Sequence, residues 1–466
     1  MNNLVIDLTH GGVKIAISLA KKGKNVLAYD IYNTLNSIDS KMLQIYNVDL
    51  IQLDDLTNFK EDMNIIYPIH MPLSFEEITS HNPNLNYTFQ THHNIIAELL
   101  KEFSPDLKKV EITGVKGKTT SAFMLKEILI DENPLILSSL GAILYKNHEK
   151  IILKKNISIT PANIKETIDL AYKYSNPICN SEEDIIDYNS CIFESSLGVS
   201  GIGDVGLLLN IIENYPIAQG RSSASQAKKQ VFKCECVCIE KETLDNYYSD
   251  VIHPKINTFS INDTNANLFL KKANYGLDKT EIEITYKNVK TVNDHTVSGE
   301  ISIDTFAPGK QHVSNVLGVV LTCICLEIDI EKIIKGLKNF KGLKGRSNKR
   351  TIENSTIIEE INPGLNTQSI KESIKMIDEL KNYYISIGGD YGITCEEIDE
   401  NILSEFLDTL THDIILTGDV GLSLSKKIHN NYQYIENYED VYKLAIKNNK
   451  NLLFIYRSNY SKVSFR

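Results

Sequence analysis

The chain has 466 residues, of which 42% are hydrophobic and 23% are charged, and its formal net charge is −11. This length allows about three domains, and the negative charge argues against nonspecific binding to nucleic acid. The eight scattered cysteines predict a cytoplasmic protein with free thiols rather than a disulfide scaffold. No apolar run is long enough to cross a membrane, the first residues do not resemble a signal peptide, and no pattern determines an oligomeric state.

The first hundred or so residues begin with two strands and a helix between them. Segments 4–8 and 25–30 are predicted to be strands, and 13–21 has helical periodicity. This order predicts a Rossmann-like half, but the GxGxxG fingerprint of a dinucleotide site is missing. The turn after the first strand lies where parallel sheets bind ligands, so it is a candidate substrate site made of Thr9, His10, Gly11 and Gly12. A tight turn that needs glycine explains these residues equally well.

Three histidines follow at positions that the sequence predicts to be loops. His70 lies between two prolines, and His92 and His93 come later. A lone loop histidine is more often structural or solvated than catalytic, so none of the three is assigned to a site.

Segment 110–120 is the strongest single feature of the sequence. An apolar β-rich run is followed by a glycine loop, and helical spacing begins after it. Such a loop points backbone N–H groups at phosphate oxygens, while its lysine reaches the β- and γ-phosphates and a hydroxyl is placed for Mg²⁺. The predicted ATP-binding residues are Gly114, Lys116, Gly117, Lys118, Thr119 and Thr120. The loop is one residue shorter than a Walker A loop, and a glycine-rich turn with a chance lysine is the alternative.

Two later strands add polar groups to this predicted site. Segment 191–196 is an apolar strand that carries Glu194 near its end, and 205–210 is a strand that ends in Asn210. Because Mg²⁺ is bound by one or two carboxylates together with waters and phosphate oxygens, Glu194 and Thr119 are the predicted metal ligands. A plain structural acid at position 194 is the alternative.

Three cysteines at alternate positions, Cys234, Cys236 and Cys238, suggest a metal site, but geometry argues against it. Alternate residues of a strand lie about 6.6–6.8 Å apart, whereas thiolates on one Zn²⁺ each lie about 2.3 Å from the metal. Three strand residues facing a core are the better interpretation. Cys323 and Cys325 are likewise predicted to pack in a core.

The remaining residues continue the alternation of strands and helices, with predicted strands at 356–360, 383–387, 413–418 and 451–456. The whole chain is therefore predicted to be an α/β protein of three domains. These are a Rossmann-like, substrate-binding N-terminal domain at 1–104, a central P-loop ATPase-type domain at 105–340, and a Rossmann-like C-terminal domain at 341–466.

Six motifs in order resemble those of the Mur ligase superfamily of ATP-dependent ligases. The glycine loop at 113–120, Thr160 before Pro161, Glu194 with its two serines, Lys228, the segment from Pro308 to Asn315, and Gly345 with Arg346 match its pattern. The resemblance implies catalytic roles for Lys118, Glu194 and Lys228, with Lys228 carbamylated. It also implies nucleotide contacts from Asn315 and Arg346, a substrate contact from Thr160, and ATP and Mg²⁺ as cofactors.

The chain also departs from that superfamily. Tyr215 stands where the family has a metal-binding histidine, and no Asp-Asn-Pro-Arg motif for amino-acid recognition is present. The opening segment 5–12 and the segments 194–198, 203–205, 215–218 and 388–392 resemble the methanogen branch that makes the nickel tetrapyrrole coenzyme F(430). That branch implies a small-molecule substrate, a nickel seco-tetrapyrrole, whose propionate is activated as an acyl phosphate and then closes a carbocyclic ring. A pseudomurein peptide ligase acting on a cell-wall precursor and a non-catalytic nucleotide-binding protein are the alternatives.

Overall fold

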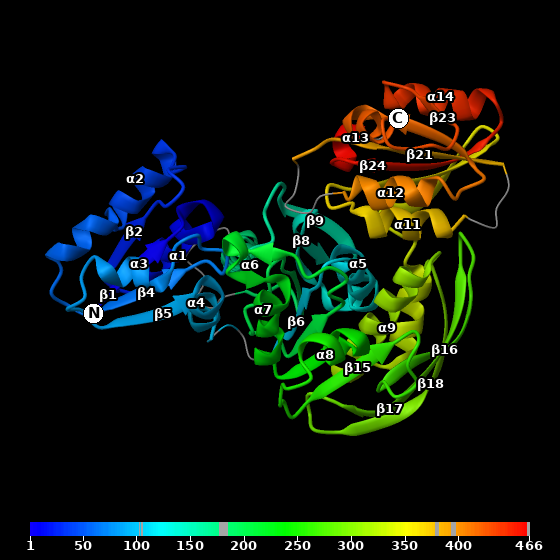
Figure 1. Cartoon of the computed structure of the whole chain (residues 1–466). Helices are drawn as coiled ribbons and strands as arrows, with labels where there is room; N and C mark the ends of the chain where they lie inside the picture. The colour runs from blue at the N-terminus through cyan, green and yellow to red at the C-terminus, as the bar shows by residue number, and fades with distance from the viewer. Residues whose placement is uncertain (102, 104–105, 177–184, 378–381, 393–397, 464–466) are drawn as a thin grey trace. The chain divides into compact units, whose positions relative to one another are not determined.

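The computed structural model describes the chain except residues 102, 104–105, 177–184, 378–381, 393–397 and 464–466 (Figure 1). It divides into two compact units. Unit 1 contains Met1–Leu270, Ile284–Ile301 and Asn315–Gly336, and unit 2 contains Lys271–Glu283, Ser302–Ser314 and Leu337–Arg466. The predicted domain boundary at 104 lies outside the described residues, and the three-domain division at 104 and 340 stays a prediction. Among the described residues, no helix is both long and apolar enough to cross a membrane.

The N-terminal part of unit 1 is a parallel sheet of five strands in the order β3-β2-β1-β4-β5. The Rossmann-like prediction is confirmed, because helices connect successive parallel strands. The strands are β1 (Asn2–Ile6), β2 (Val26–Tyr29), β3 (Asp49–Leu50), β4 (Met63–Tyr67) and β5 (Tyr87–Thr91). The helices are α1 (Val13–Lys21), α2 (Ser37–Ile45), α3 (Phe75–Ser80) and α4 (His92–Leu99).

The order of this sheet determines where a ligand can bind. The chain moves from β1 to β2 and β3 on one side, then crosses to β4 and β5 on the other. The reversal lies between β1 and β4, and ligands of open α/β sheets bind at such a point, outside the carboxyl ends of the strands. The turn that follows β1 and the loop that follows β4 are therefore neighbours in space.

The histidines of α4 correct one expectation. His92 and His93 do not lie in a loop but form the first two residues of α4, and both are buried. Thr91 caps the helix by accepting a hydrogen bond from the backbone N–H of Asn94 at 3.1 Å, which is a favourable N-cap and was not recognised in the sequence. Burial lowers the pKa of His92 to about 4, so its imidazole is neutral at pH 7.

An eleven-stranded sheet, most of which belongs to unit 1, has the order β18-β17-β16-β15-β14-β11-β6-β10-β7-β8-β9. Its centre is parallel, and the β8–β9 hairpin adds an antiparallel edge. The strands are β6 (Lys108–Thr113), β7 (Leu135–Ser138), β8 (Gly141–Lys146), β9 (Glu149–Lys154), β10 (Ser190–Glu194), β11 (Val205–Leu208), β14 (Cys236–Glu240), β15 (Ile256–Ser260), β16 (Leu268–Asn274), β17 (Thr280–Lys290) and β18 (Thr296–Thr305). The helices that follow these strands are α5 (Lys118–Ile128), α6 (Pro161–Ser175), α7 (Ala224–Lys228), α8 (Lys241–Tyr247), α9 (Lys310–Cys325) and α10 (Ile330–Asn339).

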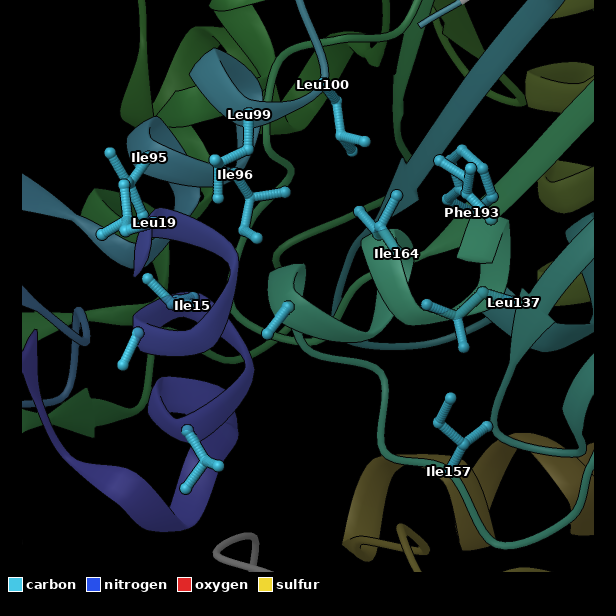
Figure 2. Close-up of a cluster of buried hydrophobic side chains, with 14 of the residues drawn as sticks. Ile15, Leu19, Ile95, Ile96, Leu99, Leu100, Leu137, Ile157, Ile164 and Phe193 are labelled. Carbon is cyan, nitrogen blue, oxygen red and sulfur yellow. The ribbon is translucent and has the colours of Figure 1, made fainter. Parts of the chain in front are cut away.

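One apolar cluster joins the two sheets of unit 1. Ile15 and Leu19 of α1 and Ile96 of α4 belong to the same buried cluster as Ile164 of α6 and Phe193 of β10 (Figure 2). All five side chains are buried, so this contact is built like a domain core. It fixes the turn after β1 against the start of α6.

The segment that contains Cys234, Cys236 and Cys238 differs in part from the predicted strand. A short 3₁₀ helix spans Lys229–Lys233, and the strand begins only at Cys236. Cys234 packs in a cluster with Val231, whereas Cys238 lies 3.5 Å from Cys325 of α9, Sγ to Sγ. All these thiols are buried, and burial raises the pKa values of Cys238 and Cys325 well above that of an ordinary cysteine. The prediction that the cysteines pack in cores is confirmed, but they face two different ones.

Unit 2 contains the C-terminal sheet, in the order β19-β20-β24-β21-β22-β23. All neighbouring pairs are parallel except β19 with β20, which confirms a second doubly wound sheet. Its strands are β19 (Arg346–Ile352), β20 (Ser355–Ile361), β21 (Tyr383–Gly389), β22 (Asp413–Thr417), β23 (Tyr432–Tyr434) and β24 (Asn451–Arg457). Its helices are α11 (Thr367–Lys375), α12 (Glu400–Leu407), α13 (Gly418–Leu424), α14 (Tyr438–Lys447) and α15 (Tyr460–Val463).

Candidate active site

The glycine loop connects the central strand β6 to α5. Gly114 has φ 147° and Gly117 has φ 87°, and Gly117 is the residue that directly precedes the helix. A side chain at Gly117 would be strained, and its Cβ would lie only 2.1 Å from Oδ1 of Asn315. The ammonium of Lys118 donates to the carbonyl oxygens of Gly114 at 3.0 Å and of Val115 at 3.3 Å, so it is held at the mouth of the loop.

Neighbouring strands fix the shape of this loop. The N–H of Val115 donates to the carbonyl of Asn210, and the N–H of Lys116 donates to the Asn210 side chain at 3.0 Å. The Asn210 amide donates in return to the carbonyl of Lys116 at 3.2 Å. The backbone of Lys116 is therefore engaged by Asn210, and the first N–H groups of α5, which a helix leaves without intrahelical acceptors, are the better candidates for phosphate. Thr120 lies buried in that first turn.

Glu194 lies directly beside the start of α5. Its strand β10 is the neighbour of β6, so the carboxylate reaches across the edge of the sheet. The hydroxyl of Thr119 donates to Glu194 Oε1 at 3.1 Å and Oε2 at 3.0 Å, and it lies 3.0 Å from the hydroxyl of Ser139. The N–H of Ser139 donates to Glu194 Oε2 at 3.1 Å. The sequence did not single out Ser139, which comes from the end of a third strand, β7.

These groups fit a magnesium ion. A buried carboxylate and two hydroxyls come together at the carboxyl ends of three adjacent strands, next to a helix N-terminus. Oxygen donors with few carboxylates are what Mg²⁺ takes when the remaining positions are filled by phosphate oxygens and water. The structure brings Thr119 and Glu194 together as predicted, and their role as metal ligands stays a prediction.

Lys228 lies close to the same strand end. It is the last residue of the short helix α7 and is fully buried. Its ammonium donates to the carbonyl of Ser196, two residues after Glu194, at 2.6 Å, and lies 5.8 Å from the centroid of the Tyr215 ring. The residue that replaces the family histidine therefore packs against the predicted carbamylation site.

The two remaining predicted nucleotide contacts fall in different units. Asn315 of α9 lies against Gly117 in unit 1, where a nucleotide held by the loop would meet it. Arg346 is the first residue of β19 in unit 2. Its contact with the nucleotide stays a prediction.

The predicted substrate residues of the two sheets come together in unit 1. A Cβ placed on Gly11 would lie 2.5 Å from Cβ of Ala162 and 3.6 Å from the hydroxyl of Thr160. The Thr9–Gly12 turn thus faces the loop at the start of α6, and the Thr160 hydroxyl is buried there without a hydrogen-bond partner. Lys14 of α1 also binds across this contact, donating to Glu166 of α6 at 2.6 Å.

Changing Gly11 to alanine is expected to destabilise unit 1. Gly11 has φ 109°, and the new methyl group would collide with Ala162, so strain and overpacking together predict a loss of about 2–5 kcal/mol. Urea unfolding measures it. Gly23→Ala is the matched control, because φ is 72° there but a Cβ would meet nothing within 4 Å. Equal losses of unfolding free energy in the two variants would mean that the contact between the sheets contributes nothing to stability.

Two further polar residues lie at this turn and were missed in the sequence. Asp7 is fully buried, and its carboxylate accepts hydrogen bonds from the N–H groups of Thr9 at 2.9 Å and His10 at 3.1 Å. His70 comes from the loop after β4. Its Nε2 lies 3.4 Å from Oδ2 of Asp7 and 3.2 Å from Nδ1 of His10. An acidic residue directly after the first strand was the available signal for Asp7.

Comparison with known proteins finds ligases whose sequences are similar to this chain. Residues 349–459 match the family model described as Coenzyme F430 synthetase CfbE, C-terminal domain. The coenzyme F(430) synthetase of Methanocaldococcus jannaschii is 28% identical over 448 residues, which cover 94% of this chain and 95% of that protein. The one from Methanosarcina acetivorans is 25% identical over 439 residues, covering 89% of each. The chain is an ATP-dependent ligase, and its sequence is similar to that of coenzyme F(430) synthetase.

A similar fold is found in solved structures. A crystal structure of MurF from Acinetobacter baumannii superposes with a TM-score of 0.56 at 15% identity, covering 85% of this chain and 82% of that one. Such a ligase uses ATP and acts on a small-molecule substrate. The residues predicted to bind phosphate lie together in unit 1, at the glycine loop and the ends of β7, β10 and β11.

Proposed function

We propose that this ligase activates a propionate side chain of a nickel seco-tetrapyrrole as an acyl phosphate, and that a carbon atom of the same molecule then displaces the phosphate to close a carbocyclic ring. The observation that carries the proposal is a continuous series of contacts from the glycine loop to the N-terminal turn. Thr119 bonds Glu194, the N–H of Ser196 donates to the carbonyl of Ile159 at 3.2 Å, and the next residue, Thr160, faces the turn. A carboxylate held at that turn would lie on the same surface as the transferring phosphoryl group.

The first step is phosphoryl transfer, which depends on positioning and charge rather than on covalent chemistry of the protein. The substrate carboxylate attacks the γ-phosphorus, the bond to the β–γ bridging oxygen breaks, and ADP leaves. Lys118 and the N-terminus of α5 would hold the phosphates and stabilise the charge that spreads over the γ-oxygens. Asn315, which lies against Gly117, would position the rest of the nucleotide.

Thr119 and Glu194 would hold a Mg²⁺ ion, which would neutralise negative charge on the phosphates. Ser139 orients the Glu194 carboxylate through its backbone N–H. Lys228, carrying CO₂ as a carbamate, would contribute a second anion beside Glu194. The carbonyl of Ser196 now accepts a hydrogen bond from the Lys228 ammonium, and this bond holds the side chain where the modification is needed.

The second step separates this proposal from an amino-acid ligase. The similarity to coenzyme F(430) synthetase covers nearly the whole chain, and it includes the C-terminal region, where cell-wall ligases carry their amino-acid motif. That motif is missing from the sequence. An intramolecular carbon nucleophile requires no second substrate and therefore no such motif.

The decisive assay supplies the intact protein with ATP, Mg²⁺ and one candidate acceptor at a time. ADP formation with the nickel seco-tetrapyrrole alone, together with a product lighter than the substrate by one water, supports the ring closure. ADP formation that depends on a free amino acid would make the protein a peptide ligase. ATP hydrolysis without any covalent product would support the alternative that the chain is a nucleotide-binding protein without ligase activity.

A further inference from the structure

A buried carboxylate and two imidazoles meet at the ligand-binding edge of the N-terminal sheet. Asp7 and His10 follow β1, and His70 follows β4, at the point where the strand order reverses. One ligand atom from each lies within 4.8 Å of those of the other two. Neither the phosphoryl transfer nor the predicted metal site uses these three residues.

Asp7 determines which nitrogen of His10 carries the proton. One carboxylate oxygen is fixed by the backbone N–H groups of Thr9 and His10, and the other lies 2.8 Å from Nδ1 of the His10 ring. An ionised carboxylate only accepts hydrogen bonds, so Nδ1 donates to it. Nε2, on the far side of the ring, then has a lone pair that can accept a proton.

The carboxylate stays ionised although it is buried. Burial raises the pKa of Asp7, but hydrogen bonds from His10 and His70 outweigh burial and hold it well below its usual value. The hydrogen bond that His10 donates to Asp7 raises the pKa of His10, which makes its imidazole a stronger base than a free histidine. The His10 side chain is 43% exposed, so a substrate can reach it.

The proposed ring closure requires a base that removes a carbon-bound proton. A carbon atom attached to hydrogen is not a nucleophile until its proton leaves. In the balanced step, that proton goes to an imidazole nitrogen, and the electron pair of the C–H bond forms the new C–C bond to the acyl carbon. The acyl C–O bond breaks, and inorganic phosphate leaves with its electrons.

We propose that His10 is the general base that removes this proton, positioned by Asp7. The inference rests on the proposed function, because the base acts on the carbon nucleophile of the proposed ring closure. Gly11, the next residue, lies against Ala162 and near Thr160, so the imidazole is on the surface that leads to the phosphoryl site. His70 lies beside the pair as a second donor to Asp7, at 3.4 Å.

The test separates acyl phosphate formation from ring closure. Wild-type protein and His10→Gln are incubated with ATP, Mg²⁺ and the nickel seco-tetrapyrrole, and acyl phosphate is trapped with hydroxylamine as a hydroxamate. We expect His10→Gln to form hydroxamate at the wild-type rate but to lose about 10²–10⁴-fold in ring closure. Exchange of the carbon-bound hydrogen with D₂O, measured by mass spectrometry without ATP, should fall in parallel.

Asp7→Asn is the second variant. Its amide oxygen can still accept from the two backbone N–H groups, but its NH₂ group would face Nδ1 and force the proton onto Nε2. We therefore expect the same selective loss of ring closure and exchange. His81→Gln is the matched control, since His81 pairs with an exposed carboxylate, Asp54, elsewhere in this sheet, and it should behave as wild type.

The outcomes distinguish the two proposals. If the wild type forms neither hydroxamate nor cyclic product from the tetrapyrrole, the proposed function fails. If the wild type closes the ring and His10→Gln closes it equally fast, only the role of His10 fails. If hydroxamate formation and ring closure fall together in His10→Gln, the role of His10 as general base is also overturned, because the residue would then act in substrate binding. A stoichiometric metal in the purified wild type that His10→Gln and His70→Ala both lose would make the cluster a metal site instead.

Discussion

Lys118→Met is expected to lower ATP-dependent ADP release by at least about 10²–10³-fold, the effect of removing one preorganised charge from a phosphoryl-transfer site. The ammonium lies where the loop carbonyls of Gly114 and Val115 hold it. Methionine has a similar length without the charge, so the loop should keep its shape. A coupled assay for ADP with the nickel seco-tetrapyrrole measures the loss.

The control for Lys118 lies in the same helix. Lys126 pairs with Glu127 and lies 4.9 Å from the centroid of the Tyr145 ring, on the part of α5 away from the loop. Lys126→Met should keep full activity and lose no more than about 1 kcal/mol of stability. Thermal unfolding shows that both variants are folded. ADP release that survives in Lys118→Met would remove this lysine from the mechanism.

The parts of the site that could be predicted are those encoded by contiguous residues. A β-strand, a glycine loop with Lys118 and a helix start form one local pattern, because each backbone group that binds phosphate comes from the same turn. Glu194 could be found because a carboxylate at the end of an apolar strand is unusual. The structure brings its side chain within 3.0 Å of the Thr119 hydroxyl.

The Asp7, His10 and His70 cluster could not be predicted as a unit. Its two histidines are 60 positions apart, and only the pairing of β1 with β4 makes them neighbours. A single sequence contains no information on strand order beyond general rules of topology. His70 therefore looked like a loop histidine, and Asp7 looked like the end of a buried strand.

Tertiary contact also explains the other differences. The 3₁₀ helix at 229–233 replaces an expected strand because Lys228 must turn toward the carbonyl of Ser196 before the chain enters β14. Cys325 meets Cys238 across 87 positions, a distance in sequence that no local pattern can bridge. In both places a long-range contact determines the local structure.

Lys228→Ala is expected to lose about 10²-fold or more of ligase activity, and the activity should return when a short carboxylate such as formate or acetate is added. If Lys228 acts as a carbamate, the enzyme needs an anion at this position, and a small carboxylate can enter the space left by the buried side chain. If Lys228 acts as an ammonium, methylammonium should restore activity and acetate should not. Steady-state rates with each additive decide between the two.

Lys229→Ala provides the matched control, because Lys229 is the next residue and is exposed. Its activity should equal that of the wild type at every carboxylate concentration. Intact-mass measurement under bicarbonate should find one added CO₂ in the wild type and in Lys229→Ala, and none in Lys228→Ala. Since the ammonium of Lys228 is fixed 2.6 Å from a carbonyl two residues beyond Glu194, a carbamate formed there would add its charge near the Glu194 carboxylate. Rescue by methylammonium alone would show instead that the anion comes from Glu194 only.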